Sequence, residues 1–180
     1  MAHIALPPDL PGITAGFAYR PATAKPLREL AEVLLRGPNT LTSGEREMIA
    51  AYVSAGNACD FCHASHRAAA ANHLDGNYAL VDAVSADPAT APVTDKIKAL
   101  LNIAGKVRES GRNVTEAVVG AARDAGATDA EIHDTVLIAA AFCMFNRYVD
   151  GLATWTPTDE TMYDEMGRRM AKDGYIRDRD

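Results

Sequence analysis

Two cysteines and a histidine lie close together in the segment EMIAAYVSAGNACDFCHASH, which runs from Glu47 to His66. Cys59 and Cys62 form a C-x-x-C motif, and His66 follows four residues later. In a helix these three positions share one face, and the cysteines are about 4.5 Å apart along the helix axis. That separation falls within the roughly 4.4–6.8 Å that a disulfide tolerates. The pair is therefore predicted to open and close a local disulfide without disturbing the fold.

A working cysteine needs a lowered pKa, because the thiolate and not the thiol attacks peroxides and disulfides. The start of a helix near Cys59 offers unpaired N–H groups and a partial positive charge. His66 could take the proton of Cys62, and Glu47 could orient the imidazole or pass the proton on. Oxidation of Cys62 by a peroxide would yield a sulfenic acid that condenses with Cys59. An external dithiol would then reduce the disulfide by exchange.

The same residues allow a metal-binding alternative. Cys59, Cys62 and His66 are three potential zinc ligands, and Cys143, His73 or His133 could supply a fourth. Structural zinc sites usually take pairs of ligands from separate elements, and this sequence contains only one such pair. We therefore favour redox chemistry over a non-enzymatic zinc or redox-sensing module.

Other polar residues near these motifs have less specific patterns. His63 is one residue from Cys62 and about 100° away around a helix, so it is expected to face solvent or a neighbouring subunit. Cys143 lies in the apolar run AAAFCMFNRY and is expected to be a small core residue. Asn146 and Arg147 in the same run need polar partners, so they could line the pocket or an interface.

The bulk composition limits the classes of function. At 180 residues the chain suits one domain covering residues 1–180. The net charge is −6 and no basic cluster occurs, so neither nucleic acid nor an anionic membrane surface is an expected partner. The N-terminal residues lack a signal-peptide pattern, and no apolar run is long enough to span a membrane. A cytoplasmic location is the resulting expectation, and there a C-x-x-C motif is more often catalytic or metal-binding than structural.

Hydrophobic periodicity predicts an all-α protein, an antiparallel helical bundle. Residues 1–26 are rich in proline and are expected to form an extended N-terminal arm. Helices are predicted from Leu27 to a stop at Gly37-Pro38, from a capping box at residues 42–45 to about residue 56, and through the cysteines to about residue 73. Further helices are expected over 78–85, 94–108, 115–125 and 129–149, and Thr128 with Glu131 forms a second capping box at the start of the last of them. The Arg168-Arg169 pair and the charged tail 172–180 are expected to be solvated.

The layout E-x11-C-x2-C-x3-H, formed by Glu47, Cys59, Cys62 and His66, resembles that of the AhpD-like alkyl hydroperoxidases in the carboxymuconolactone decarboxylase superfamily. The stretches LPPDLPGITAGFAYRPATAKPL and FNRYVDG also look like the peroxidase-related subgroup of that family. The resemblance implies an AhpD-like all-α bundle that assembles as a dimer, trimer or hexamer.

The resemblance also implies roles for the four residues. Cys62 would be the peroxidatic cysteine, Cys59 the resolving cysteine that exchanges with the reductant, and His66 with Glu47 the proton relay. The implied activity is a thiol-dependent peroxidase that reduces hydrogen or organic hydroperoxides. Its electrons would come from a lipoyl-bearing or other dithiol protein, with no haem or flavin.

The chain departs from the best-studied members at one position. They have a histidine immediately before the second cysteine, where this sequence has Phe61. Phe61 is expected to favour a bulkier organic substrate. The superfamily also leaves open a decarboxylase-like activity on a small organic acid or lactone, although its founding members typically lack the C-x-x-C motif.

Overall fold

Helices make up all the regular secondary structure of residues 1–176, the part of the chain that the computed structural model describes. This confirms the predicted all-α class. The α-helices are α1 (Ile13–Tyr19), α2 (Pro21–Arg36), α3 (Ser43–Gly56), α4 (Asp60–His73), α5 (Tyr78–Ala86), α6 (Asp95–Glu109), α7 (Glu116–Asp124), α8 (Asp129–Gly151) and α9 (Glu160–Asp173). A short 3₁₀ helix, Gly111–Asn113, lies between α6 and α7.

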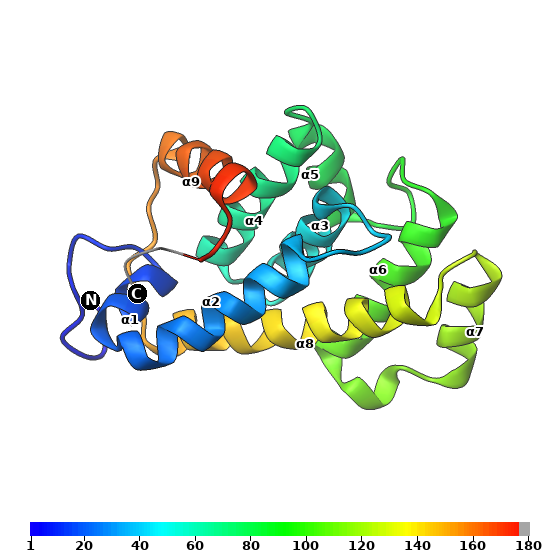
Figure 1. The fold of residues 1–180 in the computed structure, drawn as a ribbon, viewed down its shortest axis with the longest axis horizontal. Coiled ribbons are helices and arrows are strands. Elements are labelled where there is room, and N and C mark those ends of the chain that lie inside the picture. The colour runs from blue at the N-terminus through cyan, green and yellow to red at the C-terminus, as the bar shows by residue number, and fades with distance from the viewer. Residues whose placement is uncertain (177–180) are drawn as a thin grey trace.

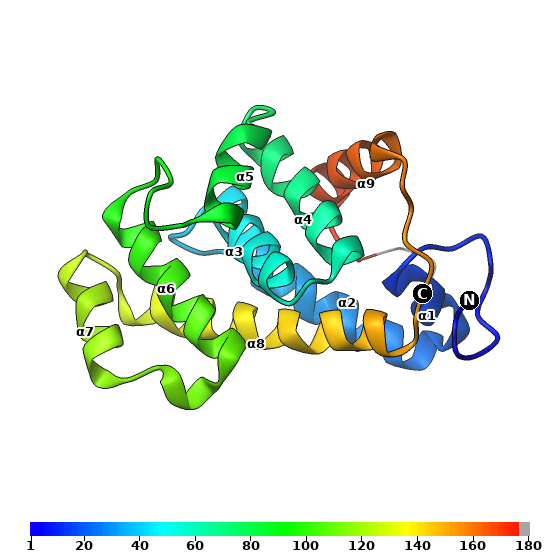
Figure 2. The same cartoon turned by 180° about the vertical axis from the view of Figure 1, so that it is seen from behind.

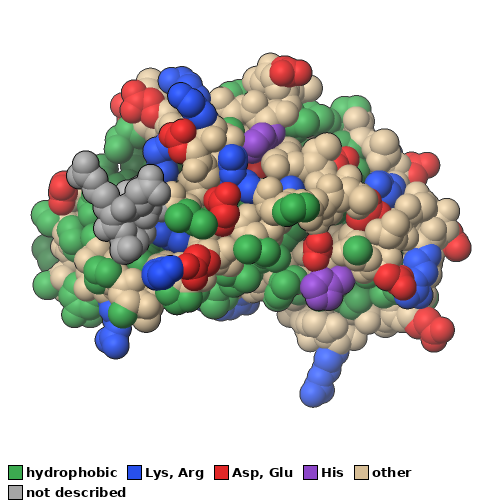
Figure 3. Space-filling model, viewed as in Figure 1, with side chains coloured by type: hydrophobic (Ala, Val, Ile, Leu, Met, Phe, Trp, Pro, Cys, Tyr) green, Lys and Arg blue, Asp and Glu red, His purple; other side chains and the backbone are tan. Residues whose placement is uncertain are grey.

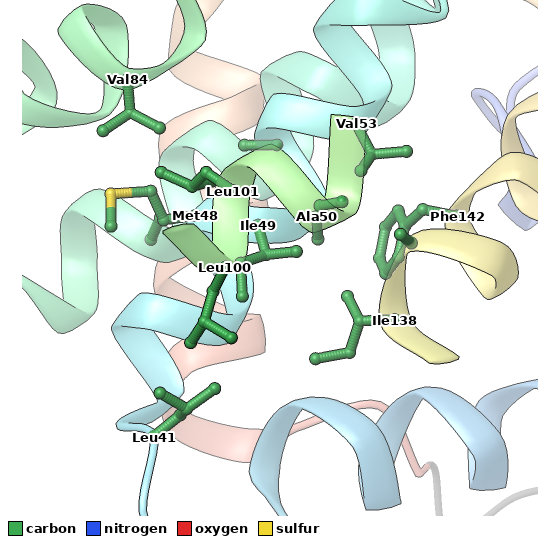
Figure 4. Close-up of a cluster of buried hydrophobic side chains, with 14 of the residues drawn as sticks. Leu41, Met48, Ile49, Ala50, Val53, Val84, Leu100, Leu101, Ile138 and Phe142 are labelled. Atoms are coloured by element: carbon green, nitrogen blue, oxygen red, sulfur yellow. The ribbon is translucent and has the colours of Figure 1, made fainter. Parts of the chain in front are cut away.

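The long helix α8 runs along the molecule, and α2 and α6 lie against it (Figures 1 and 2). The main core lies between α3, α6 and α8. Ile49 and Val53 of α3, Leu100 of α6, and Ile138 and Phe142 of α8 point toward one another there (Figure 4). All five are essentially inaccessible to solvent, so burial of apolar surface holds these helices together.

Helices α3 and α4 form a hairpin that brings the predicted site residues together. Helix α3 begins with the predicted capping box, in which the Thr42 side chain and Glu45 each accept from the other's backbone N–H. After α3 the chain turns through Ala58, whose φ is 56°, and Cys59 becomes the N-cap of α4. The two helices then run back along each other, with Glu47 on one and His66 on the other.

The predicted extended arm over residues 1–26 is wrong beyond residue 12. Residues 13–19 form α1, and α2 begins at Pro21 instead of Leu27. Proline suits the first position of a helix, because its ring presets φ and its missing N–H would have no helical partner there. Ala15 and Phe17 of α1 are buried. This segment is therefore part of the packed structure.

The C-terminal region is also less exposed than expected. Helix α9 packs along α4 (Figure 2). The Arg36 guanidinium of α2 donates to the carbonyl oxygens of Met170 (3.0 Å) and Ala171 (2.5 Å), and so satisfies the end of α9. The predicted solvated tail is thus wrong for residues 174–175, which return to the core, while residues 177–180 of that tail lie outside the described residues.

The contact between α4 and α9 depends on Gly167. A Cβ at this position would lie 2.5 Å from the carbonyl carbon and from the Cβ of Ala68 on α4. Gly167→Ala is therefore expected to lower the free energy of unfolding by about 2 kcal/mol through overpacking. Gly120→Ala is the matched control, because nothing lies within 4 Å of a Cβ there, and it is expected to stabilise by up to about 1 kcal/mol. Urea unfolding of both variants checks this, and an equal effect at the two glycines would contradict it.

A buried carboxylate, Glu131, joins three parts of the bundle. It completes the predicted capping box of α8 with Thr128, and it accepts hydrogen bonds from Lys96 (2.8 Å) and Thr40 (2.9 Å). Burial alone would raise the pKa of Glu131, but these hydrogen bonds outweigh it and lower the pKa to about 2. Because this pKa is depressed in the folded state, the stabilisation is complete at neutral pH and is lost as the pH falls toward 2.

Glu131→Ala is expected to cost about 2 kcal/mol of stability at pH 7, from loss of the cap and of charged hydrogen bonds. Glu131→Gln, which can still cap the helix, should cost less. The difference in the free energy of unfolding between either variant and the parent should decrease as the pH is lowered. Urea unfolding at a series of pH values measures this, and a gap that widens in acid would contradict it.

No helix within residues 1–176 is long and apolar enough to cross a membrane. On the face seen in Figure 3, basic and acidic side chains are interspersed and do not gather into a basic patch.

Candidate active site

The two cysteines of the C-x-x-C motif lie at the start of α4, and both are buried free thiols. Cys59 caps the helix, and its thiol donates a hydrogen bond to the sulfur of Cys62 in the first turn. This hydrogen bond, with burial, raises the pKa of Cys59 far above its ordinary value. The same hydrogen bond lowers the pKa of Cys62, and a positive charge on His66 lowers it further. The arrangement therefore favours Cys62 as the thiolate of the pair.

His66 and Glu47 are joined by a hydrogen bond beside Cys62. The distance from His66 Nδ1 to Glu47 Oε2 is 2.7 Å, and the Glu47 side chain has no exposed surface. If Nδ1 carries the proton that Glu47 accepts, Nε2 is left to exchange a proton with a reacting group. The Phe142 ring packs against the imidazole in a T-shaped arrangement, with ring centroids 4.5 Å apart. The histidine is thus held in one orientation by a carboxylate and by an aromatic ring.

Tyr175 completes this group and is absent from the sequence prediction. Its hydroxyl donates a hydrogen bond to Glu47 Oε1, and its ring stacks on His66 with centroids 6.1 Å apart. Burial, followed by the neighbouring Glu47 charge, raises the pKa of Tyr175 well above its ordinary value, so the phenol stays protonated. Tyr175 is 128 residues from Glu47 in sequence. No local pattern signals such a contact, because it depends on how α9 packs.

A cavity of about 80 Å³ opens beside Cys62 and His66. Its walls are largely apolar and come from both ends of the chain as well as from α4 and α8. The lining residues are Ile13, Thr14, Phe17, Leu27, Arg28, Ala31, Phe61, Cys62, His66, Phe142, Phe145, Met166, Arg169, Met170 and Tyr175. The segment expected to be an arm contributes to this pocket, and so does Arg169, which was expected to be solvated; Arg168 is exposed, as predicted.

Phe61 immediately precedes Cys62, at the position where the family resemblance predicts a histidine. Its side chain is 3% exposed and lines the cavity. Gly12, with φ 53°, lets the backbone lie against the ring, since a Cβ there would be 2.1 Å from two of the ring carbons. Phe61 therefore makes the wall next to Cys62 apolar.

Asn146 of α8 lies beside Cys59 of the dithiol. Its Nδ2 donates to Ser54 Oγ (3.0 Å), its Oδ1 accepts from Asn57 (2.8 Å), and its carbonyl oxygen is 4.0 Å from Cys59 Sγ. A hydrogen bond from its side chain also contributes to the lowered pKa of Cys62. Arg147 is exposed and bonds a carbonyl of its own helix. Of the two candidates in this run, only Asn146 belongs to the site.

The remaining candidates lie apart from this group. His63 is partly buried, with Nδ1 3.1 Å from the carbonyl oxygen of Ala51, and it does not line the cavity. Cys143 is half-buried and lies 3.6 Å from Asn57 Nδ2. Among residues 1–176 no three His, Cys, Asp or Glu side chains are placed to hold a metal ion together. The zinc alternative therefore finds no ligand set in this part of the chain.

Comparison with known proteins identifies a family and solved structures to which this chain is similar. The sequence pattern of the carboxymuconolactone decarboxylase family matches residues 21–104. An uncharacterised peroxidase-related protein from Silicibacter sp. TM1040 superposes with a TM-score of 0.77 and 26% identity, over 88% of this chain and 81% of that one. No curated protein matches the sequence.

A second solved structure has a similar fold. It is an alkylhydroperoxidase AhpD core, an uncharacterised peroxidase-related protein from Ralstonia eutropha JMP134, with a TM-score of 0.77 and 28% identity over 88% of this chain and 82% of that one. The chain thus matches the carboxymuconolactone decarboxylase family over residues 21–104, and its fold is similar to that of AhpD-like, peroxidase-related proteins.

Proposed function

We propose that the protein is a thiol-dependent peroxidase that reduces organic hydroperoxides. The observation that carries this proposal is the position of Cys62. It is a thiol with a lowered pKa, it lies beside an imidazole held by a buried carboxylate, and it lines an apolar cavity. The coarser assignment, an AhpD-like enzyme, agrees with the family and with the peroxidase-related neighbours.

In the first step His66 takes the proton of Cys62, and the thiolate attacks the terminal oxygen of the hydroperoxide. The S–O bond forms as the O–O bond breaks, so the sulfur is oxidised to a sulfenic acid and the peroxide is reduced. The leaving alkoxide takes the proton back from the imidazolium and departs as an alcohol. Glu47 stabilises the imidazolium during this transfer.

In the second step the Cys59 sulfur attacks the sulfenic sulfur of Cys62. The S–S bond forms, and the hydroxide that leaves combines with the Cys59 proton to give water. The disulfide is then reduced by an external dithiol, which becomes oxidised in exchange. We propose a dithiol or lipoyl-bearing protein as that reductant, in line with the family resemblance.

The apolar wall next to Cys62 favours an organic substrate over hydrogen peroxide. Phe61→His is expected to lower kcat/KM for cumene hydroperoxide by about tenfold, because a polar ring replaces apolar contact area. The rate with hydrogen peroxide should stay the same or rise, since an imidazole adds a proton donor. Steady-state rates with the two peroxides measure this. Equal changes for both substrates would show that Phe61 has no part in selectivity.

Counting free thiols after peroxide treatment tests the proposed function. One equivalent of cumene hydroperoxide should remove two of the three thiols, and a dithiol should restore both. Mass spectrometry should locate the disulfide between Cys59 and Cys62 and find Cys143 unmodified. Loss of one thiol, or a disulfide that includes Cys143, would overturn the proposal.

A further inference from the structure

We propose that Tyr175 is a positioning residue of the dithiol centre, which acts by holding Glu47 in the orientation that serves His66. This inference rests on the proposed function for its biological meaning, but it concerns the reactivity of Cys62 and can be tested without any peroxide. It extends the relay from two side chains to three and includes the C-terminal segment in the active site.

The first argument is the sharing of the Glu47 carboxylate. Its Oε1 accepts the hydrogen bond from the Tyr175 hydroxyl, and its Oε2 lies 2.7 Å from His66 Nδ1. A carboxylate with one oxygen bound by the phenol presents the other to the imidazole in a fixed plane. Nδ1 then keeps its proton and donates it in a hydrogen bond to Glu47, and Nε2 is the nitrogen that exchanges a proton with Cys62.

The second argument is the cost of leaving Glu47 without this donor. The Glu47 side chain has no exposed surface, so water does not replace a missing hydrogen bond there. A buried carboxylate that loses one of its two donors is no longer fixed in the plane that faces His66 Nδ1. It then stabilises the imidazolium less, and the thiolate of Cys62 loses part of its stabilising charge. The effect of Tyr175 on Cys62 is therefore indirect, through Glu47 and His66.

The third argument is that the chain holds Tyr175 in place from its other side. The backbone N–H of Tyr175 donates to Glu32 Oε2 of α2 (2.8 Å). Gly174, with φ 77°, fits closely against Glu32, since a Cβ there would lie 2.4 Å from the same Oε2. Arg36 holds the end of α9 and also pairs with Glu32 at 3.3 Å. The segment after α9 is therefore anchored to α2 at several points.

Other charged groups lie near the relay of Cys62, His66 and Glu47 and can affect how the reactivity of Cys62 depends on pH. On α3, Arg46 interacts electrostatically with Glu47, and on α4 His73 does so too, while Arg36 and Glu32 of α2 act on Tyr175. Burial lowers the pKa of His73 and raises that of Tyr175. The titrations of His73 and Tyr175 should therefore be distinguishable from the ionisation of the Cys62 thiol in the alkylation profile.

The test is the pH dependence of Cys62 alkylation by iodoacetamide in the reduced protein. In Tyr175→Phe the midpoint should move up by about one pH unit, which corresponds to a roughly tenfold slower reaction below the midpoint. Tyr163→Phe is the matched control. It also removes a buried hydroxyl close to the cysteines, but that hydroxyl donates to the carbonyl oxygen of Pro157 and not to Glu47 or His66, so the midpoint should stay unchanged.

A double-mutant comparison separates positioning from general loosening of the structure. In a Glu47→Gln background, Tyr175→Phe should produce no further shift, because its effect passes through the carboxylate. Glu32→Gln, which keeps the phenol but weakens its anchor, should give a smaller upward shift and serves if Tyr175→Phe folds poorly. An unchanged midpoint in both Tyr175→Phe and Glu32→Gln would overturn the proposal, as would a full shift in the Glu47→Gln background.

These outcomes are distinguishable from failure of the proposed function. If the parent does not reduce hydroperoxides but Tyr175→Phe shifts the alkylation midpoint, the peroxidase proposal fails and the role of Tyr175 stands. If the parent reduces hydroperoxides but Tyr175→Phe does not shift the alkylation midpoint, the peroxidase proposal stands and the proposed role of Tyr175 fails.

Discussion

Replacing Cys62 with serine is expected to abolish hydroperoxide reduction, a loss of more than about a thousandfold relative to the parent. A serine hydroxyl at this position has no accessible anion near neutral pH, so it does not attack the O–O bond. The thiolate is favoured at Cys62 because Cys59 donates a hydrogen bond to it and a charged His66 stabilises it. Consumption of cumene hydroperoxide with excess dithiothreitol measures the loss.

Cys59→Ser should behave differently, because this residue acts after the peroxide has been cleaved. One equivalent of hydroperoxide should still be reduced, and the sulfenic acid on Cys62 should then persist long enough to be trapped with dimedone. Cys143→Ser, which removes a half-buried thiol away from the cavity, is the control and should match the parent. A Cys62→Ser variant that still turns over peroxide would refute the assigned order of the two cysteines.

His66→Ala is expected to slow the reaction of Cys62 at neutral pH by about tenfold to a hundredfold. The sign follows from the lowered pKa of Cys62. A positive imidazole beside it stabilises the thiolate, so removing the ring moves the thiol pKa back toward its ordinary value. The variant should therefore recover at alkaline pH, where the thiol ionises without help. Rates of iodoacetamide alkylation between about pH 5 and pH 10, a range that includes the ordinary thiol pKa of about 8.5, show this.

His63→Ala is the natural comparison, because both histidines are on α4 and His63 immediately follows Cys62 in sequence. Its Nδ1 lies by the carbonyl oxygen of Ala51, and it does not line the cavity. The pH profile of this variant should match that of the parent. If the two histidine variants change the profile equally, the effect would belong to α4 as a whole and not to the pairing of His66 with Glu47.

Much of the fold was predictable because the signals that produce it are local. The capping boxes at Thr42 and Thr128 mark where two helices begin, and both are present in the structure. Apolar residues at helical spacing identify the faces of α3, α6 and α8 that form the core. The extended arm was wrong because proline near the start of a helix is compatible with it, and composition alone does not distinguish the two cases.

The four predicted site residues were also accessible to local reasoning, because they lie on one helical hairpin. The spacing within a helix predicts that Cys59, Cys62 and His66 share one face. Glu47 lies on the preceding helix, which packs back along the helix of the cysteines. The structure brings these four together, while their chemical roles remain a proposal. Tyr175 was not accessible in this way, since it approaches Glu47 only after α9 has packed on α4 and the chain has turned at Gly174.

The sequence by itself thus determined the helical class, the boundaries of most helices and the dithiol with its histidine and glutamate. These depend on hydrogen bonds and side-chain faces that repeat within a few turns of helix. Only the tertiary structure decided what surrounds Cys62. The cavity walls from α1, α2 and α9, the choice of Asn146 over Arg147, and the phenol on Glu47 all arise where distant segments pack together. Such contacts depend on the shape and burial of the whole bundle, which no local spacing encodes.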